Sequence, residues 1–74
     1  MRKLNDILEE VLECEFFDDI SKDNCESWDS INHVNIILEL QDEYDIKIDH
    51  QDIDKLLSYN SILNYLKNLG ITVS

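Results

Sequence analysis

Residues 28–44, with the sequence WDSINHVNIILELQDEY, contain the longest helical pattern of the chain. Asp29 and Ser30 are both favourable N-cap residues, so the pattern predicts a helix from Ser30 to about Tyr44, with Trp28 as a loop anchor before it. The apolar residues form two stripes on nearly opposite sides of this helix, one with Ile36, Ile37, Leu40 and Tyr44, the other with Ile31, Val34 and Leu38. We expect one stripe to face the core and the other to reach the surface as a docking site, unless neighbouring segments cover both.

Helical spacing also appears before this stretch. Leu4, Ile7, Leu8, Val11 and Leu12 alternate with acidic residues, which predicts an amphipathic helix of about three turns. Cys14 is expected to fill a small gap near its end. Periodicity is then lost over 15–29, which indicates a long ordered loop held by Phe16, Phe17 and Ile20. This loop is rich in Asp and Asn, but it lacks the central glycine of an EF-hand, so we predict no metal site.

Shorter elements follow the long helix. Ile46 and Ile48 are expected to plug the bundle, and a short helix is predicted over 50–57 with Ile53, Leu56 and Leu57 turned inward. Ser58 or Asn60 can cap a final helix, whose core spacing is carried by Ile62, Leu63, Leu66 and Leu69. Gly70 is the predicted C-cap of that helix. Residues 71–74 are expected to be a tail.

These elements define one small domain over residues 1–74. Proline is absent, Gly70 is the only glycine, and no hairpin signal such as Asn-Gly occurs. The predicted fold is therefore all-α, a small four-helix bundle with three main helices and one short one. A chain of 74 residues buries only about 60–65% of its unfolded surface, so its stability should be marginal and a deep enzymatic pocket is not expected.

The chain is strongly acidic and its charge is unevenly placed. Seventeen acidic residues oppose six basic ones, for a net charge of −11, and no acidic residue follows Lys55. This charge disfavours binding to nucleic acids and to anionic membranes. Partners should carry basic patches, although acidity that only maintains solubility is an alternative. Cys14 and Cys25 have no C-x-x-C spacing, and no segment resembles a signal peptide, so we expect free thiols, a cytoplasmic protein and a monomer.

Ser30 is the best candidate for chemistry. His33 follows three residues later and could meet Ser30, but a nucleophilic serine also needs an orienting group and an oxyanion hole, for which no glycine-rich turn exists. We therefore expect no enzyme, and His33 is predicted to be a surface residue. Ser30 can instead accept a phosphodiester, which would meet the N–H groups and the positive dipole end of the helix, with Asp29 helping to hold a cation during transfer. On position alone, simple capping by Ser30 is favoured.

A resemblance to a known protein family favours attachment at Ser30 over simple capping. Asp29-Ser30-Ile31, followed by Val34, residues 36–38, Leu40, Asp42-Glu43, Tyr44 and Ile48, resembles the D-S-L signature and second helix of acyl carrier proteins. The first helix, the long loop, Leu56-Leu57 and the helix containing Ile62, Tyr65 and Leu66 also lie where that family has its own helices and loop.

The resemblance implies a carrier function. A phosphopantetheinyl transferase would attach 4′-phosphopantetheine to Ser30, assisted by Asp29, and the thiol of this arm would carry acyl or aminoacyl groups as thioesters. Enzymes that load and transfer these groups would then dock on the second helix. The implied contact residues are Ile31, Val34, Leu38, Glu39, Asp42 and Glu43.

Some positions differ from the family pattern. Ile31 replaces the usual leucine, and Asn35 and Gln41 are neutral where fatty-acid carriers are often acidic, which puts recognition by fatty-acid enzymes in doubt. Trp28 and His33 are more similar to stand-alone carriers of polyketide, peptide or polysaccharide-modifying pathways. Two alternatives remain open: a peptidyl or aminoacyl carrier domain, and an acidic interaction module that is never modified.

Overall fold

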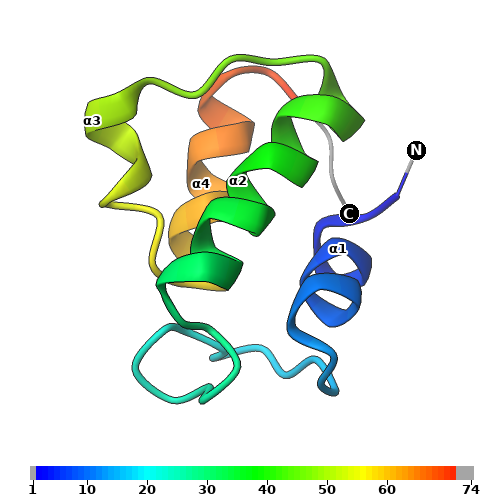
Figure 1. Cartoon of the computed structure of the whole chain (residues 1–74). Helices are drawn as coiled ribbons and strands as arrows, with labels where there is room; N and C mark the ends of the chain where they lie inside the picture. Colours follow the sequence, from blue (N-terminus) through cyan, green and yellow to red (C-terminus); the bar gives the residue numbers. More distant parts are fainter. Residues whose placement is uncertain (1, 72–74) are drawn as a thin grey trace.

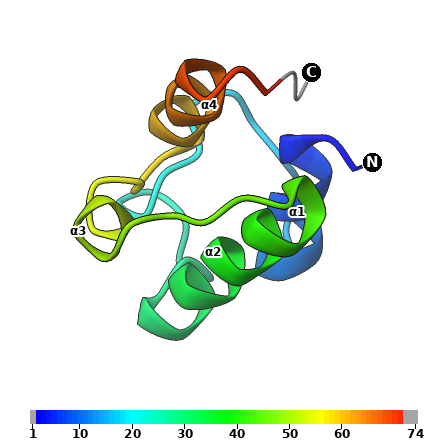
Figure 2. The same ribbon diagram turned by 90° about the horizontal axis from the view of Figure 1, so that it is seen from above.

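Four α-helices make up the regular structure of residues 2–71, the part of the chain that the computed structural model describes. They are α1 (Leu4–Leu12), α2 (Ser30–Tyr44), α3 (His50–Ile53) and α4 (Tyr59–Asn68). α1 runs antiparallel to α2, and α4 runs in the direction of α2 (Figure 1). Seen from above, the helices surround one core, with α1 and α3 on opposite sides (Figure 2). The prediction of an all-α bundle with three main helices and one short one is confirmed.

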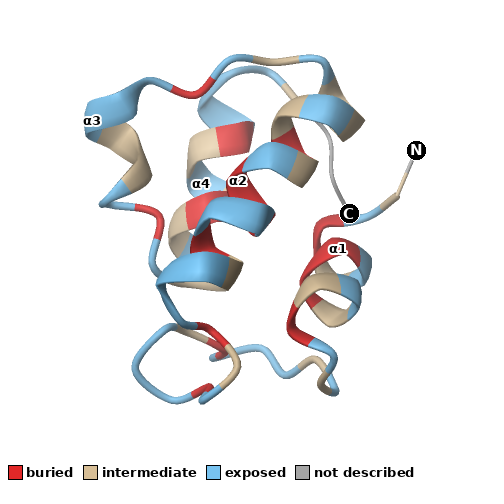
Figure 3. Cartoon of the chain, in the orientation of Figure 1, coloured by how far each residue is buried: buried red, intermediate tan, exposed pale blue. Residues whose placement is uncertain are grey.

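The core is built from the helical spacing that the sequence shows. Leu4, Ile7, Leu8 and Leu12 of α1 are buried, and so are Ile36, Ile37 and Leu40 of α2. The opposite face of α2 is exposed, so the expected division into a buried and a surface stripe is confirmed (Figure 3). Ile48 is buried and Ile46 is half-buried between α2 and α3, as predicted.

α3 is shorter than the predicted helix over 50–57, because it ends at Ile53. Beyond it the backbone of Leu57 is engaged elsewhere, since its carbonyl accepts a hydrogen bond from Lys22 N at 2.8 Å. A helix that continued through Leu57 would direct this carbonyl along its own axis. Leu56 is buried and Ile53 half-buried, as expected, but Leu57 is exposed, so its predicted inward orientation is wrong.

α4 has well-formed ends. Ser58 is its N-cap and forms a reciprocal capping box with Ser61, so Asn60 is not the cap. The C-cap is Leu69 and Gly70 follows with φ +83°, which places Gly70 at the left-handed position just past the cap rather than at the cap itself. Gly70 N donates to Lys67 O and Ile71 N donates to Leu66 O, which is a Schellman motif.

This ending corrects two predictions. Leu69 was expected in the core, but it is half exposed because the chain leaves the helix there. Ile71, predicted to belong to a tail, instead folds back and packs against the core. The rest of the predicted tail, residues 72–74, lies outside the described residues.

The loop between α1 and α2 is ordered by a few buried side chains, as predicted. Ile20, Cys25 and Trp28 are buried in the core cluster. Phe16 packs edge-on against Tyr59, with ring centroids 4.8 Å apart, whereas Phe17 is exposed and is not the anchor that was expected.

Candidate functional site

Ser30 is the first residue of α2, and its side chain is exposed. The N-cap is Asp29, whose Oδ1 accepts a hydrogen bond from Asn32 N at 2.8 Å. Within residues 2–71, no hydrogen bond links the Ser30 side chain to another residue. Capping, which position alone favoured for Ser30, is therefore performed by Asp29, and the Ser30 hydroxyl is available at the positive end of the helix dipole.

The turn that leads into Ser30 is held by its own hydrogen bonds. Trp28 N donates to Cys25 O and Asp29 N donates to Ser27 O, each at 3.0 Å. The side chain of Asn32 reaches back from the first turn of α2 and donates to Ser27 O at 2.7 Å. These contacts fix the direction in which α2 begins, and so the position of Ser30.

Trp28 and His33 fasten this turn to the core. Trp28 Nε1 donates to His33 Nδ1 at 3.0 Å, and His33 Nε2 lies 2.8 Å from Ile53 O. His33 is only 6% exposed, so its prediction as a surface residue is wrong. The spacing of residues 33, 36, 37, 40 and 44 places it on the buried stripe, and this signal could have found it.

His33 is also unable to serve Ser30 as a base. Indole N–H only donates, so Nδ1 must be the acceptor, and Nε2 then carries the proton that it donates to Ile53 O. Both ring nitrogens are engaged away from Ser30. The serine–histidine pair considered from the sequence is therefore not formed.

A second set of contacts joins the loop to the linker before α4. Tyr59 N donates to Ile20 O at 3.0 Å, next to the Lys22–Leu57 hydrogen bond, so that Ser21 and Ser58 form an isolated antiparallel bridge. Within the loop, Asn24 accepts from Ser21 N and donates to Asp19 O, each at 2.8 Å. The segment before Ser30 thus has backbone contacts at several points along its length.

An apolar face lies along α2 beyond Ser30. Ile31, Val34 and Leu38 are 73%, 52% and 56% exposed, and their spacing places them on one side of the helix. Apolar side chains exposed side by side in this way are typical of protein-interaction surfaces. We call these three residues the α2 face.

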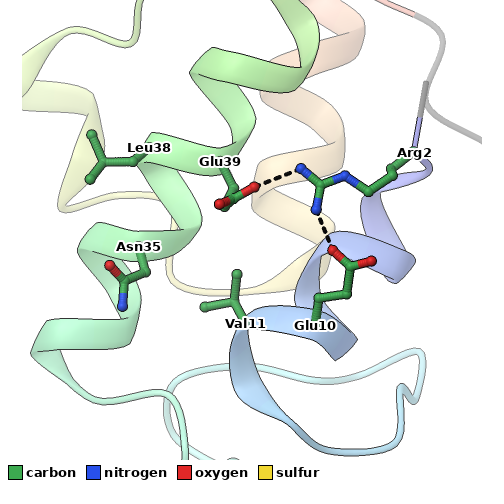
Figure 4. Close-up of a pocket in the computed structure, with 6 residues that line it drawn as sticks. All are labelled: Arg2, Glu10, Val11, Asn35, Leu38 and Glu39. Carbon is green, nitrogen blue, oxygen red and sulfur yellow. Dashed lines mark hydrogen bonds and ion pairs between the residues drawn. The ribbon is translucent and has the colours of Figure 1, made fainter.

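A shallow, open pocket of about 310 Å³ adjoins the α2 face, between α1 and α2. Its lining consists of Arg2, Glu10, Val11, Asn35, Leu38 and Glu39 (Figure 4). Leu38 therefore belongs both to the face and to the pocket wall. The lining mixes apolar and charged side chains, so the pocket extends the face toward α1 rather than forming a closed cavity.

Arg2 crosses from the N-terminal end of α1 to α2. Its guanidinium forms ion pairs with Glu10, Glu39 and Glu43, and the pair with Glu39 measures 2.6 Å. The hydrogen bonds that Arg2 donates to these carboxylates raise the pKa of Arg2, and Arg2 lowers the pKa of Glu43. We call this group the Arg2 clamp. Of the acidic residues expected to meet partners, Glu39 and Glu43 are thus engaged within the chain, whereas Asp42 is exposed.

Across residues 2–71, no three His, Cys, Asp or Glu side chains are arranged to hold a metal ion. No helix of this part of the chain is long and apolar enough to cross a bilayer.

Comparison with known proteins finds a partial similarity. An acyl carrier protein from Campylobacter lari is 32% identical over 41 residues, which are 55% of this chain and 53% of the relative. The match thus spans about half the length of this curated relative. No family model matches the chain, and no solved structure matches it. The similarity is to an acyl carrier protein and covers only part of each chain.

Proposed function

We propose that this protein is a carrier that holds acyl or aminoacyl intermediates as thioesters on a 4′-phosphopantetheine arm attached to Ser30. The observation that carries this proposal is the Ser30 hydroxyl, which is exposed at the first position of α2 and is not needed as a cap because Asp29 fills that role. The partial similarity to an acyl carrier protein supports it. The chain itself would then be non-catalytic.

The residues around Ser30 fit such an attachment. The Ser30 oxygen can form the new P–O bond while its proton leaves and the pyrophosphate P–O bond of coenzyme A breaks, with the nucleotide part of coenzyme A as the leaving group. The phosphodiester then lies at the positive end of the α2 dipole. The exposed Asp29 carboxylate has one oxygen that caps α2 and a second with which it can help to hold a divalent cation during transfer. When bound, the arm supplies the thiol that carries the cargo.

Partner enzymes would dock on the α2 face. Ile31, Val34 and Leu38 offer apolar contact area beside Ser30, and Asp42 adds negative charge. A partner with an apolar pocket and a basic rim complements this arrangement. Glu39 would contribute less charge than the sequence implies, because Arg2 already neutralises part of it.

Intact mass tests the attachment. Incubation with coenzyme A and a broad-specificity phosphopantetheinyl transferase should add one phosphopantetheine to the wild type and none to Ser30→Ala. Ser27→Ala is the matched control, because the loop uses the backbone carbonyl of Ser27 and not its hydroxyl; it should be modified like the wild type. A folded wild type that several transferases leave unmodified would contradict the proposal and favour an unmodified interaction module.

The same assay separates two roles of Asp29. Asp29→Asn keeps an oxygen that can accept from Asn32 N, so its free energy of unfolding should stay close to that of the wild type. Loss of the carboxylate charge should nevertheless slow modification of Ser30. Equal modification rates would remove Asp29 from the proposal while leaving Ser30 in place.

Substitution on the α2 face tests docking. Leu38→Asp should weaken binding of the unmodified protein to the transferase by about tenfold, since it places a charge in the apolar contact, and it should change stability little because Leu38 is exposed. Asn68→Asp, an exposed position at the end of α4, adds the same charge away from this face and serves as the control. Equal affinities for the two variants in titration calorimetry would locate docking elsewhere.

A further inference from the structure

Two thiols of the loop between α1 and α2 lie next to each other. Cys14 follows the end of α1, and Cys25 lies three residues before Trp28. Their Sγ atoms are 3.7 Å apart, and both are free thiols, as predicted. Disulfide sulfurs lie about 2.05 Å apart, so a bond requires an approach of only about 1.7 Å.

The two cysteines differ in how easily a reagent can reach them. Cys14 is half-buried, whereas Cys25 belongs to the buried core. Burial raises the pKa of the Cys14 thiol, and the neighbouring Cys25 and the Glu9 carboxylate raise it further. Cys14 is therefore protonated at neutral pH, and the dithiol is the resting form. Oxidation then depends on a reagent that reaches Cys14 first.

We propose that Cys14 and Cys25 form a reversible redox pair that closes to an intramolecular disulfide when the protein meets a hydroperoxide. The Cys14 thiol loses its proton, the thiolate attacks the terminal peroxide oxygen and the O–O bond breaks. The leaving oxygen takes up a proton, so that a sulfenic acid and an alcohol (water, from hydrogen peroxide) are formed. The Cys25 sulfur then attacks the sulfenic sulfur. The S–S bond forms, the S–O bond breaks, and the hydroxyl leaves with the Cys25 proton as water. The two sulfurs together lose two electrons to the peroxide, and a dithiol reductant reverses the change by exchange.

The bond would join the end of α1 to the turn that positions Ser30. Cys25 O accepts the hydrogen bond from Trp28 N, so the cross-link lies one turn away from the Trp28–His33 contact. The disulfide closes a short loop, residues 14–25, and so lowers the conformational entropy of the unfolded chain. We expect the oxidised protein to melt about 5–15 °C higher and the amides of this loop to exchange more slowly. This inference does not depend on modification of Ser30.

The test uses the unmodified full chain at low micromolar concentration. After treatment with hydrogen peroxide and then N-ethylmaleimide, the wild type should be lighter by two hydrogen atoms, monomeric and without adducts. If the oxidised protein is reduced with dithiothreitol before N-ethylmaleimide is added, it should gain two adducts. Cys25→Ser should instead accumulate a sulfenic acid at Cys14 that dimedone traps, whereas Cys14→Ser, with only the buried thiol, should react more slowly.

The wild type alone is enough to decide the outcome if either variant fails to fold. Among chains whose Cys14 has been oxidised, the ratio of intramolecular disulfide to dimedone-trapped sulfenic acid should be at least about tenfold higher in buffer than in denaturing urea, because folding holds the sulfurs together. Two alkylatable thiols after peroxide treatment, a bond only between two chains, or a ratio that is equal or higher in urea would each overturn the proposal.

Discussion

Trp28 and His33 place two polar rings in the interior, where each depends on the other. Within residues 2–71, the indole N–H is satisfied by His33 Nδ1, and the imidazole is satisfied on its other side by Ile53 O. Buried polar groups are costly when they lose their partners. At the scale of single residues, this chain of hydrogen bonds connects the Ser30 turn, α2 and α3.

His33→Leu should therefore be strongly destabilising. It leaves Trp28 Nε1 without an acceptor, whereas Ile53 O keeps the hydrogen bond from Leu56 N. We expect the free energy of unfolding to fall by about 1–3 kcal/mol in urea titrations. His50→Leu changes the other histidine, which is exposed on α3, and should stay within about 0.5 kcal/mol of the wild type. Similar losses for the two variants would show that the buried hydrogen bonds contribute little.

The sequence was informative about Ser30 and misleading about His33 for the same reason. Cap preferences are local, so a helix beginning at residues 29–30 could be predicted, although not which of the two residues caps it. The burial of His33 depends on its hydrogen bonds to Trp28 and Ile53, and tertiary packing brings these three residues together. The polarity of histidine suggested a surface position, whereas the place of His33 in the helical pattern indicated the core.

At the scale of elements, the Arg2 clamp holds α1 against α2. α1 has no side-chain hydrogen bond at its N-cap, Lys3, so its first turn lacks that support. Arg2 contacts one carboxylate on α1 and two on α2, and Tyr44 Oη donates to Arg2 O at 2.8 Å. No pattern in the sequence distinguishes these three carboxylates from the other acidic residues, of which the chain has seventeen in all.

Arg2→Gln should lower the melting temperature at pH 7, and the difference from the wild type should shrink in acid. Arg2 lowers the pKa of Glu43 below its ordinary value of 4.5, so the folded state binds fewer protons than the unfolded state. The resulting stabilisation is present above pH 4.5 and is lost as pH falls through the lowered pKa.

Melting curves at pH 7, 5 and 3 measure this difference. Lys3→Gln removes the neighbouring positive charge, for which no ion pair is found within residues 2–71, and is the matched control. A gap between wild type and Arg2→Gln that is as large at pH 3 as at pH 7 would assign the effect to packing of the side chain instead.

Element boundaries were predictable where they are set locally. α2 begins and ends as the sequence predicts, because Asp29 and the apolar spacing lie within the element itself. α3 was predicted too long, because its end is fixed by the pairing of Leu57 with Lys22, which belong to separate segments. The proximity of Cys14 and Cys25 was not predicted either, because it too depends on contacts between residues that are not neighbours in the sequence.

At the scale of the whole molecule, the net charge of −11 is spread over a body of 29 × 25 × 19 Å. The Debye length is about 30 Å at 0.01 M salt and about 8 Å at 0.15 M, so at low salt the acidic residues repel one another across the entire protein. The Arg2 clamp offsets only part of this repulsion. The fold class was predictable despite it, because apolar periodicity and the scarcity of glycine and proline already favour packed helices.

Sodium chloride should therefore stabilise the protein. Between about 0.01 and 0.15 M at pH 7, the melting temperature should rise by several degrees, since screening weakens the repulsion. The same comparison near pH 4.2, where the net charge is close to zero, should show little change. A melting temperature that falls with salt at pH 7 would mean that the ion pairs outweigh the repulsion.

The bridge between Ser21 and Ser58 also has a consequence for synthesis. The loop before Ser30 is closed by hydrogen bonds to the backbone of Leu57 and Tyr59, which are translated long after Ser30 itself. A nascent chain that has not yet reached residue 57 lacks both hydrogen bonds, even though Asp29, the N-cap of α2, has already been synthesised. The native loop that leads to Ser30 can therefore close only after the start of α4 has left the ribosome.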